Sequence, residues 1–323
     1  MHIGHYITLF VGLATPAYAI EIAMPVECEM GTKCVVQNYV DHDSAKGDKA
    51  YNDFTCGHLS YDGHKGTDIR AVDESVMNTS ISVLAVADGV VLGKRDGVKD
   101  RAPVIKNQEC GNGVRISHAD GWTTQYCHMK NGSVTVKKGQ KVTTGDVLGK
   151  IGLTGNTEFP HVHLSIEKDG KHIDPYSGTA LGEPCSIENL KPLWSAEAAK
   201  QLAYKPTGLL GGGFTNKEIK ANDLAKGLHH NTSLSGKEPV LIFWVNMYGV
   251  QRGDTAHLSL HNPSGEVVVE KSNGIENNRA TQNYFIGKIN KQGWPAGKYT
   301  GKLRLERNGN AVIEREFTIM VGA

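Results

Sequence analysis

The sequence has almost no net charge, which limits the classes of partner that it can have. Its 35 Lys and Arg residues are balanced by 34 Asp and Glu residues, so the formal net charge is +1 over 323 residues. A nucleic-acid-binding protein needs concentrated positive charge, so the composition gives no electrostatic argument for that class. The length is sufficient for two domains of ordinary size.

Two common signatures of metal sites are also absent. No two cysteines have the C-x-x-C spacing that begins a thiolate zinc site, and no H-E-x-x-H occurs. The six cysteines therefore favour disulfide bonds in an oxidising compartment, and all of them precede residue 186. One pairing has a local argument, because Cys110 and Cys127 stand nearly opposite each other in a predicted hairpin of residues 114–118 and 122–129.

The apolar run near the N-terminus, residues 7–14, is too short to span a bilayer. The small residues of Thr15-Pro16-Ala17-Tyr18-Ala19 fit signal-peptidase cleavage, although no Lys or Arg precedes the run. We therefore expect residues 1–19 to be a signal peptide, with export to the periplasm or the extracellular space and no transmembrane anchor after cleavage. A buried N-terminal helix is the alternative interpretation.

The rest of the chain is rich in turns and in β-type patterns, with 38 glycines and 39% hydrophobic residues. Residues 56–178 contain short strands and tight turns, including a predicted hairpin of residues 82–87 and 90–93. Strands at this spacing predict an antiparallel sheet or barrel. Residues 214–323 contain six or seven strands with period-two patterning and predict an immunoglobulin-like β-sandwich. We thus expect a mainly β protein.

The expected domain boundaries follow changes in composition. Residues 20–190 form the first domain, and residues 191–213 form a helical, glycine-rich linker. In that linker Ser195 is the expected N-cap of a short helix, and Gly211-Gly212-Gly213 indicates the boundary. Residues 214–323 contain no catalytic constellation, so this domain is expected to bind a protein or glycan partner or to act as a spacer.

Two segments carry candidate metal ligands. In Pro160-His161-Val162-His163, polar and apolar residues alternate, which predicts a strand with both imidazoles on one face. In Gly63-His64-Lys65-Gly66-Thr67-Asp68, a histidine and a carboxylate four residues apart can converge on one ion. Two histidines and one aspartate leave the fourth tetrahedral position of Zn²⁺ open, which is the pattern of a catalytic site.

Other histidines are weaker candidates. In the predicted strand of residues 122–129, alternation places Thr124, Tyr126 and His128 on one face, where His128 can lie beside a metal without binding it. Asp41-His42-Asp43 has ligand-type side chains, but nothing nearby completes a site and a solvated turn is expected. Of the remaining histidines, no site role is expected for His58, and His118 and His172 are expected to be structural or exposed. The four histidines of residues 214–323 are expected to lie on the surface, namely His229, His230, His257 and His261.

Taken together, three segments resemble the motifs of the lysostaphin/LytM-type zinc metallopeptidases. They are residues 63–68, residues 126–128 and residues 160–163, and the resemblance covers roughly residues 56–178. It implies a barrel-like peptidase domain of the duplicated hybrid motif type with one Zn²⁺, bound by His64, Asp68 and His163. It also implies that His128 and His161 flank the bound water or the transition state as the catalytic acid and base.

The family cleaves peptide bonds in bacterial peptidoglycan, in stem peptides or in cross-bridges. The resemblance therefore implies an exported zinc metalloendopeptidase that uses zinc-activated water with a histidine base, since the glutamate of H-E-x-x-H is missing. Which of His128 and His161 is the base stays open. Some family members have lost ligands, but this chain has not. The appended β-sandwich and the charged loop of residues 96–111 support the alternative, a non-catalytic cell-wall-binding or hydrolase-regulating protein that keeps the fold. A biotinyl or lipoyl carrier, modified at Lys130, is a third reading that export disfavours.

Overall fold

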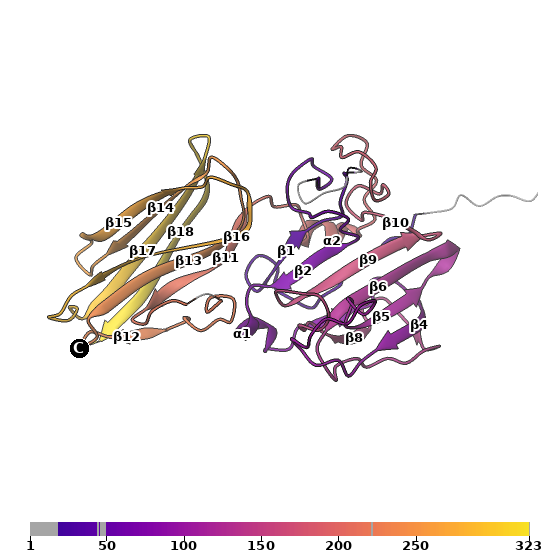
Figure 1. The fold of residues 1–323 in the computed structure, drawn as a ribbon, viewed down its shortest axis with the longest axis horizontal. Helices are drawn as coiled ribbons and strands as arrows, with labels where there is room; N and C mark the ends of the chain where they lie inside the picture. The colour runs from indigo at the N-terminus through magenta and orange to yellow at the C-terminus, as the bar shows by residue number, and fades with distance from the viewer. Residues whose placement is uncertain (1–18, 44, 46–49, 221, 323) are drawn as a thin grey trace, which may run out of the picture.

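The computed structural model describes residues 19–43, 45, 50–220 and 222–322, so nearly all of the predicted signal peptide lies outside the described residues. Figure 1 shows two β-rich domains side by side, with β1–β10 in one and β11–β18 in the other. The prediction of a mainly β chain with antiparallel sheets is confirmed. Within the described ranges, no helix is long and apolar enough to cross a bilayer.

The first domain is built on an eight-stranded sheet with the order β1-β2-β9-β6-β5-β4-β7, in which β10 pairs with β9. Its strands are β1 (Cys34–Asn38), β2 (Thr67–Ala71), β4 (Gly89–Arg95), β5 (Asn112–Ser117), β6 (Trp122–Met129), β7 (Lys141–Val142), β9 (His161–Lys168) and β10 (Lys171–His172). A short 3-10 turn, η1 (Ala119–Gly121), joins β5 to β6. Strands β3 (Ser82–Leu84) and β8 (Val147–Lys150) form a separate two-stranded sheet. The predicted hairpin of residues 82–87 and 90–93 is therefore wrong, because β3 pairs with β8 and β4 with β5 and β7.

Strand β9 shows how the sequence pattern positions the polar side chains. Val162, Leu164 and Ile166 are fully buried in the core of the first domain. Because successive side chains of a strand point to opposite faces, His161 and His163 project from the other face of the sheet. The predicted alternation is confirmed, and it supplies a polar face that is backed by a packed core.

The second domain is a sandwich of two sheets, β11-β13-β16 and β12-β18-β17-β14-β15. Its strands are β11 (Gly208–Thr215), β12 (Ser233–Ser235), β13 (Val240–Val250), β14 (Thr255–His261), β15 (Val267–Gly274), β16 (Arg279–Ile289), β17 (Gly297–Arg307) and β18 (Asn310–Gly322). The pairing of β13 with β16, and of β17 with β14 and β18, reproduces the B–E and C–F–G pairings of immunoglobulin domains. A second hydrophobic core, with Phe243, Tyr299 and Leu305 at its centre, lies within this domain.

The segment between the domains differs from the expected linker. Helix α2 (Ala196–Gln201) is present, and the Ser195 Oγ accepts a hydrogen bond from the Ala198 N–H as expected of an N-cap. The three glycines, however, lie inside β11. A Cβ added to Gly212 would lie 2.5 Å from the Phe317 ring, and Gly211 lies against Trp244. These glycines allow β11 to approach aromatic rings closely, so they do not mark a flexible boundary.

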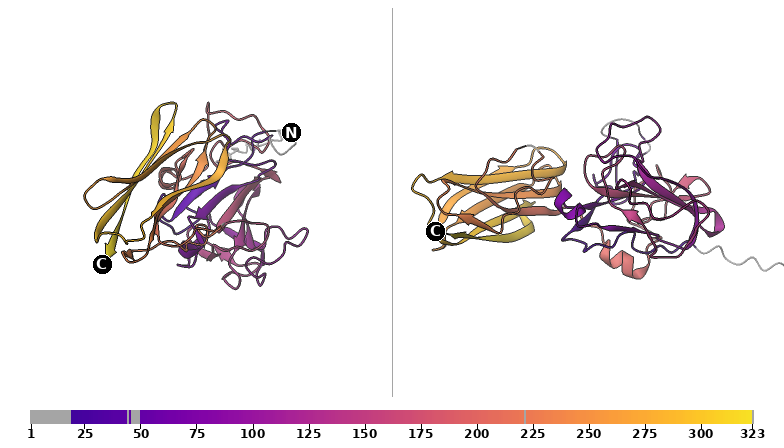
Figure 2. Two further views of the ribbon diagram at one scale, coloured as in Figure 1. Left: turned by 60° about the vertical axis from the view of Figure 1, so that its left-hand side comes forward. Right: turned by 90° about the horizontal axis from the view of Figure 1, so that it is seen from below.

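The two domains contact each other directly. Val35 and Val72 of the first domain form a small buried cluster with Leu210 and Tyr248 of the second. His230 Nε2 lies 2.7 Å from Asp73 Oδ2, and Asp73 is also the N-cap of helix α1 (Glu74–Met77). Figure 2 shows α1 beside the sandwich when the molecule is seen from below. The sandwich therefore packs against the β1–β2 edge of the first sheet.

Some residues that were expected to be solvated are buried. His42 is 3% exposed, and its Nε2 lies 2.9 Å from Asp174 Oδ2. Asp41 is 1% exposed and accepts a hydrogen bond from the Gly63 N–H. In the sandwich, His229 is also buried, with Nδ1 near Thr215 Oγ1. The expectation of a solvated turn at residues 41–43 is wrong, because these side chains hold distant loops together.

We expect Gly212→Val to destabilise the sandwich, because the new side chain would overlap the Phe317 ring. Overpacking of this kind typically lowers the free energy of unfolding by about 1–3 kcal/mol. Urea unfolding monitored by fluorescence measures the loss. Gly274→Val is the matched control, because open space surrounds a Cβ at that strand position. An equal loss in both variants would contradict the packing role of Gly212.

Candidate metal centre

Strands β2, β9 and β6 lie side by side and bring the first candidate residues together. Asp68 pairs across the sheet with His163, and His163 pairs with Cys127. Partners in an antiparallel pair project from the same face, about 4.5–5.5 Å apart at Cβ. The register alone therefore places the carboxylate of β2 beside the second imidazole of β9. His64 reaches the same point from the turn that precedes β2.

Three ligand-type atoms converge on the polar face of the sheet. His64 Nε2 lies 3.1 Å from Asp68 Oδ1 and 3.1 Å from His163 Nδ1. The third side of this triangle, from His163 Nδ1 to Asp68 Oδ1, measures 2.8 Å. Atoms that bind one zinc ion at about 2.0–2.2 Å must lie within about 4.4 Å of one another, and all three pairs do.

The outward-facing atoms of these side chains are held by polar partners. His64 Nδ1 lies 2.6 Å from the Tyr39 carbonyl oxygen, which can only accept, so the ring proton resides on Nδ1. His163 Nε2 lies 2.9 Å from Ser165 Oγ, a contact that lets this ring keep its proton on Nε2. Anchors of this kind set the tautomer of a metal-binding imidazole. In the neutral rings, the unprotonated atoms are then His64 Nε2 and His163 Nδ1, which face each other and Asp68.

Burial and charge determine the protonation of this cluster. Burial disfavours the charged form of each group, but attraction to the His64 and His161 imidazoles outweighs it at Asp68. The pKa of this carboxyl is consequently held well below its usual value. The same attraction overcomes burial at His64 and raises its pKa. The site therefore holds an ionised carboxylate, and the two nitrogens and one oxygen form a donor set that can hold a metal ion.

His128 reaches this site through a β-bulge. In the pairing of β5 with β6, Asn112 lies opposite Met129 and Val114 opposite Tyr126, so Cys127 and His128 together oppose one residue. His128 has a φ of 63°, a left-handed conformation that is uncommon outside glycine. A bulge of this kind redirects a side chain, and bulges are frequent beside active sites. The bulge turns His128 toward the cleft that also contains Cys127.

The predicted grouping of His128 with Thr124 and Tyr126 on one face is therefore wrong. Tyr126 is fully buried and its hydroxyl accepts a hydrogen bond from the Val86 N–H, on the core side of the sheet. Strict alternation would place His128 on that side too. The prediction that His128 lies near the candidate ligands is nevertheless met, since its ring centroid is 6.1 Å from that of His163.

His128 and His161 form a second pair of imidazoles, with ring centroids 4.6 Å apart. The Nδ1 of His128 lies 2.8 Å from the Thr154 carbonyl oxygen, and that of His161 lies 2.9 Å from the Phe159 carbonyl oxygen. In its neutral form, each ring therefore carries its proton on Nδ1 and leaves Nε2 as the acceptor. The Nε2 of His161 is 3.5 Å from Asp68 Oδ1. Burial, helped by the neighbouring imidazoles, lowers the pKa of His128 to about 3.

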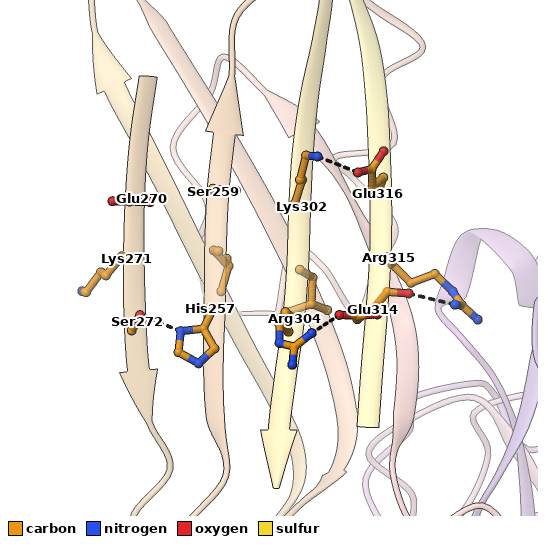
Figure 3. A pocket seen from close by; sticks show the side chains of 12 residues that line it. His257, Ser259, Glu270, Lys271, Ser272, Lys302, Arg304, Glu314, Arg315 and Glu316 are labelled. Carbon is orange, nitrogen blue, oxygen red and sulfur yellow. Dashed lines mark hydrogen bonds and ion pairs between the residues drawn. The ribbon is translucent and has the colours of Figure 1, made fainter. Parts of the chain in front are cut away.

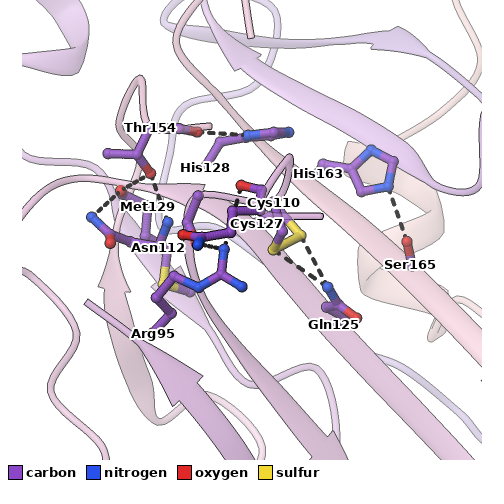
Figure 4. The surroundings of a disulfide bond; sticks show 12 residues. Arg95, Cys110, Asn112, Gln125, Cys127, His128, Met129, Thr154, His163 and Ser165 are labelled. Atoms are coloured by element: carbon purple, nitrogen blue, oxygen red, sulfur yellow. Dashed lines mark hydrogen bonds between the residues drawn. A yellow bond between two sulfur atoms is a disulfide. The ribbon is translucent and has the colours of Figure 1, made fainter. Parts of the chain in front are cut away.

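The predicted Cys110–Cys127 disulfide is confirmed and lies beside this bulge (Figure 4). The His128 N–H donates to the Cys110 carbonyl oxygen at 2.8 Å, so the loop that carries Cys110 also holds the redirected residue. The other two disulfides are Cys28–Cys34 and Cys56–Cys185. All three lie in the first domain, as the positions of the cysteines predicted.

An open cleft of about 400 Å³ leads to these residues. Its lining is Tyr61, Gly63, His64, Lys65, Glu109, Cys110, Gln125, Cys127, His128, Asn156, His163, Ser165, Glu167 and His172. Two of these residues are not predicted as site residues from the sequence. They are Tyr61, whose ring centroid is 4.2 Å from that of His64, and His172. Alternation along the strand predicts Ser165 on the face of His163 and, two residues further, Glu167, whereas no local signal distinguishes Tyr61.

The outer face of the sandwich carries a second hollow, of about 720 Å³, on strands β15, β14, β17 and β18 (Figure 3). Several of its charged side chains pair with one another. Lys302 Nζ lies 2.7 Å from Glu316 Oε1, Arg304 contacts Glu314, and His257 Nδ1 lies 2.7 Å from Ser272 Oγ. Among the described residues, this face does not bring three metal-ligand atoms together as the cleft does.

Comparison with known proteins places these residues in context. The sequence profile of Peptidase family M23 matches residues 62–175. Stage II sporulation protein Q of Bacillus subtilis is 30% identical over 190 residues, which are 58% of this chain and 60% of that protein. Peptidoglycan DD-endopeptidase ShyA of Vibrio cholerae is 32% identical over 111 residues, or 34% of this chain and 22% of that protein. The catalytic domain of lysostaphin from Staphylococcus simulans is 20% identical, with a TM-score of 0.29 over 45% of this chain and 89% of that one.

The chain spans between about a fifth and three fifths of the length of the first curated relatives that it matches. The matched segment begins just before His64 and ends after β10, so it contains His64, Asp68, His128, His161 and His163. The family profile thus matches nearly the same region, residues 62–175, as the resemblance of the three short motifs, which covers roughly residues 56–178. Residues 62–175 of this chain form a domain of peptidase family M23.

Proposed function

We propose that this chain is an exported zinc metalloendopeptidase that hydrolyses peptide bonds in bacterial peptidoglycan. The observation that carries the proposal is the convergence of His64 Nε2, Asp68 Oδ1 and His163 Nδ1 within 3.1 Å of one another at an open cleft. Two histidines and a carboxylate are a typical protein ligand set of catalytic zinc, which keeps a further position open. All five side chains that the family resemblance requires are present.

His128 and His161 would move protons in this reaction. Zinc, when bound, acts as a Lewis acid that polarises the scissile carbonyl and makes a nearby water more acidic. In a neutral ring, the Nε2 of His128 or of His161 can accept the proton of the attacking water. The ring that becomes protonated can then donate a hydrogen bond to the developing oxyanion or a proton to the leaving amine. The Thr154 and Phe159 carbonyl oxygens hold the two rings in the orientation that this transfer needs.

The cleft and the disulfides support the substrate class and the compartment. The cleft is open and has the charged side chains of Lys65, Glu109 and Glu167 in its lining, which suits an extended and polar peptide. The three disulfides fit an exported protein in an oxidising compartment. Among the described residues, every group that lines this cleft belongs to the first domain. A protein- or glycan-binding role of the sandwich stays a prediction.

The roles of the two histidines of β9 can be separated. We expect His163→Ala to lose stoichiometric zinc, because it removes one of three ligands. His161→Ala should retain zinc but lose about 10²–10⁴-fold in turnover, the usual contribution of a general acid or base. Metal analysis of the dialysed proteins and a peptide-release assay provide the two measurements. Loss of zinc from His161→Ala would contradict this assignment.

The protonation of His128 gives a pH prediction. Its folded pKa of about 3 lies below the ordinary value of about 6.5, so the unfolded chain binds the proton more tightly. The stability that depends on neutral His128 is fully present above about pH 6.5 and is lost as the pH falls toward 3. Urea unfolding of the metal-free protein should therefore depend less on pH in this window for His128→Gln. His257→Gln, on the sandwich surface, is the control and should behave like the wild type.

The proposed function itself is tested with defined muropeptides. Residues 20–323, loaded with one equivalent of zinc, should release peptide products whose masses locate the cleaved bond. Removal of zinc with a chelator should abolish the release, and added zinc should restore it. A zinc-loaded protein that digests neither sacculi nor cross-linked muropeptides would contradict the proposal and favour a non-catalytic role in the cell wall.

A further inference from the structure

Strand β1 lies outside residues 62–175, yet it contacts the proposed metal ligands. Asn38, its last residue, places Nδ2 3.0 Å from Asp68 Oδ2. The next residue, Tyr39, places its carbonyl oxygen 2.6 Å from His64 Nδ1. Two of the three proposed ligands are thus oriented by a segment that precedes the family match.

A second β-bulge brings Asn38 to this position. In the pairing of β1 with β2, Val36 lies opposite Ile69 and Asn38 lies opposite Asp68, which leaves Gln37 as the extra residue. In a regular ladder without a bulge, Gln37 would stand opposite Asp68, and Asn38 would be one position further along. The side chain of Gln37 does not reach Asp68 but contacts Arg70, whose guanidinium donates a hydrogen bond to Gln37 Oε1.

The contact between Asn38 and Asp68 is shielded from water. Asn38 is 6% exposed and Asp68 is 1% exposed. A buried carboxylate oxygen requires a donor, and the amide of Asn38 supplies one without adding charge. Because Oδ2 is engaged on the β1 side, Oδ1 is the oxygen that faces His64 and His163. The side chain of Asn38 therefore selects which carboxylate oxygen is offered to an ion.

Strand β1 is itself held at its other end. Cys34, its first residue, is bonded to Cys28, and Val35 belongs to the buried cluster between the domains. These attachments limit the movement of β1 along β2. Because β1 is fixed, the side-chain amide of Asn38 stays within hydrogen-bond distance of Asp68.

We propose that Asn38 is a positioning residue of the metal centre, which holds Asp68 so that Oδ1 points to the ion. This inference rests on the proposed function in one respect, the assignment of His64, Asp68 and His163 as zinc ligands. Groups that orient a metal ligand typically contribute a factor of about 10–100 to metal affinity. Asn38 acts through Asp68 and touches neither substrate nor reacting atoms.

The test measures zinc affinity in the full chain by competition with a chelating dye. Asn38→Leu keeps a similar side-chain volume and removes the donor, so its zinc affinity should fall by about 10–100-fold. Asn38→Asp, a second variant of nearly the same shape, places a carboxylate beside Asp68 Oδ2 and should weaken zinc binding as well. Circular dichroism of the metal-free variants establishes that they are folded.

Gln37→Leu is the matched control. Gln37 belongs to the same bulge and is equally buried, but it contacts Arg70 and no proposed ligand. Its zinc affinity should stay within about twofold of the wild type even if its melting temperature falls. The inference is overturned if Asn38→Leu binds zinc as tightly as the wild type, or if Gln37→Leu weakens zinc binding to the same extent. A wild-type chain that binds zinc but releases no peptide would contradict the proposed function alone, and the affinity comparison would still decide the role of Asn38.

Discussion

The register of strands β2, β9 and β6 is the constraint on which the rest of the site depends. It aligns Asp68, His163 and Cys127 across the sheet, on the face opposite the core. Fully buried apolar residues on the other face, such as Ile69 and Val162, oppose any slip of this register. A shift by one residue would turn His163 toward the core and Val162 toward the cleft. The hydrophobic core thus fixes the geometry of a polar centre without contributing a ligand to it.

Regular pairing does not complete the site, because two further residues reach it through bulges. The bulge at Cys127 and His128 turns an imidazole to the cleft, and the bulge at Gln37 brings Asn38 opposite Asp68. A non-glycine residue in a left-handed conformation, such as His128, costs about 1–3 kcal/mol and persists only where its surroundings impose it. Here the Cys110–Cys127 disulfide and the hydrogen bond to the Cys110 carbonyl oxygen supply that restraint. The disulfides therefore shape the cleft as well as stabilise the domain.

Several features were predictable because their signals are local. Alternation along residues 161–166 was sufficient to place both histidines of β9 on one face. The Ser195 cap and the Cys110–Cys127 pairing were also predicted from nearby sequence. The glycines at 211–213 were misread, because a glycine required for contact with Phe317 resembles a glycine in a flexible linker when only the chain is seen. His42 was misread for a similar reason, since its partner Asp174 lies 132 residues away.

The sequence by itself identified His64, Asp68 and His163 as candidate ligands, because the three motifs around them resemble those of a zinc metallopeptidase family. It also determined the β character of both domains, since period-two patterning is a local property. Only the tertiary structure decided how His128 reaches the cleft and that Asn38 supports Asp68. A bulge is a mismatch between two strands, so it is defined by the pairing of distant segments, and no pattern within one strand reveals it.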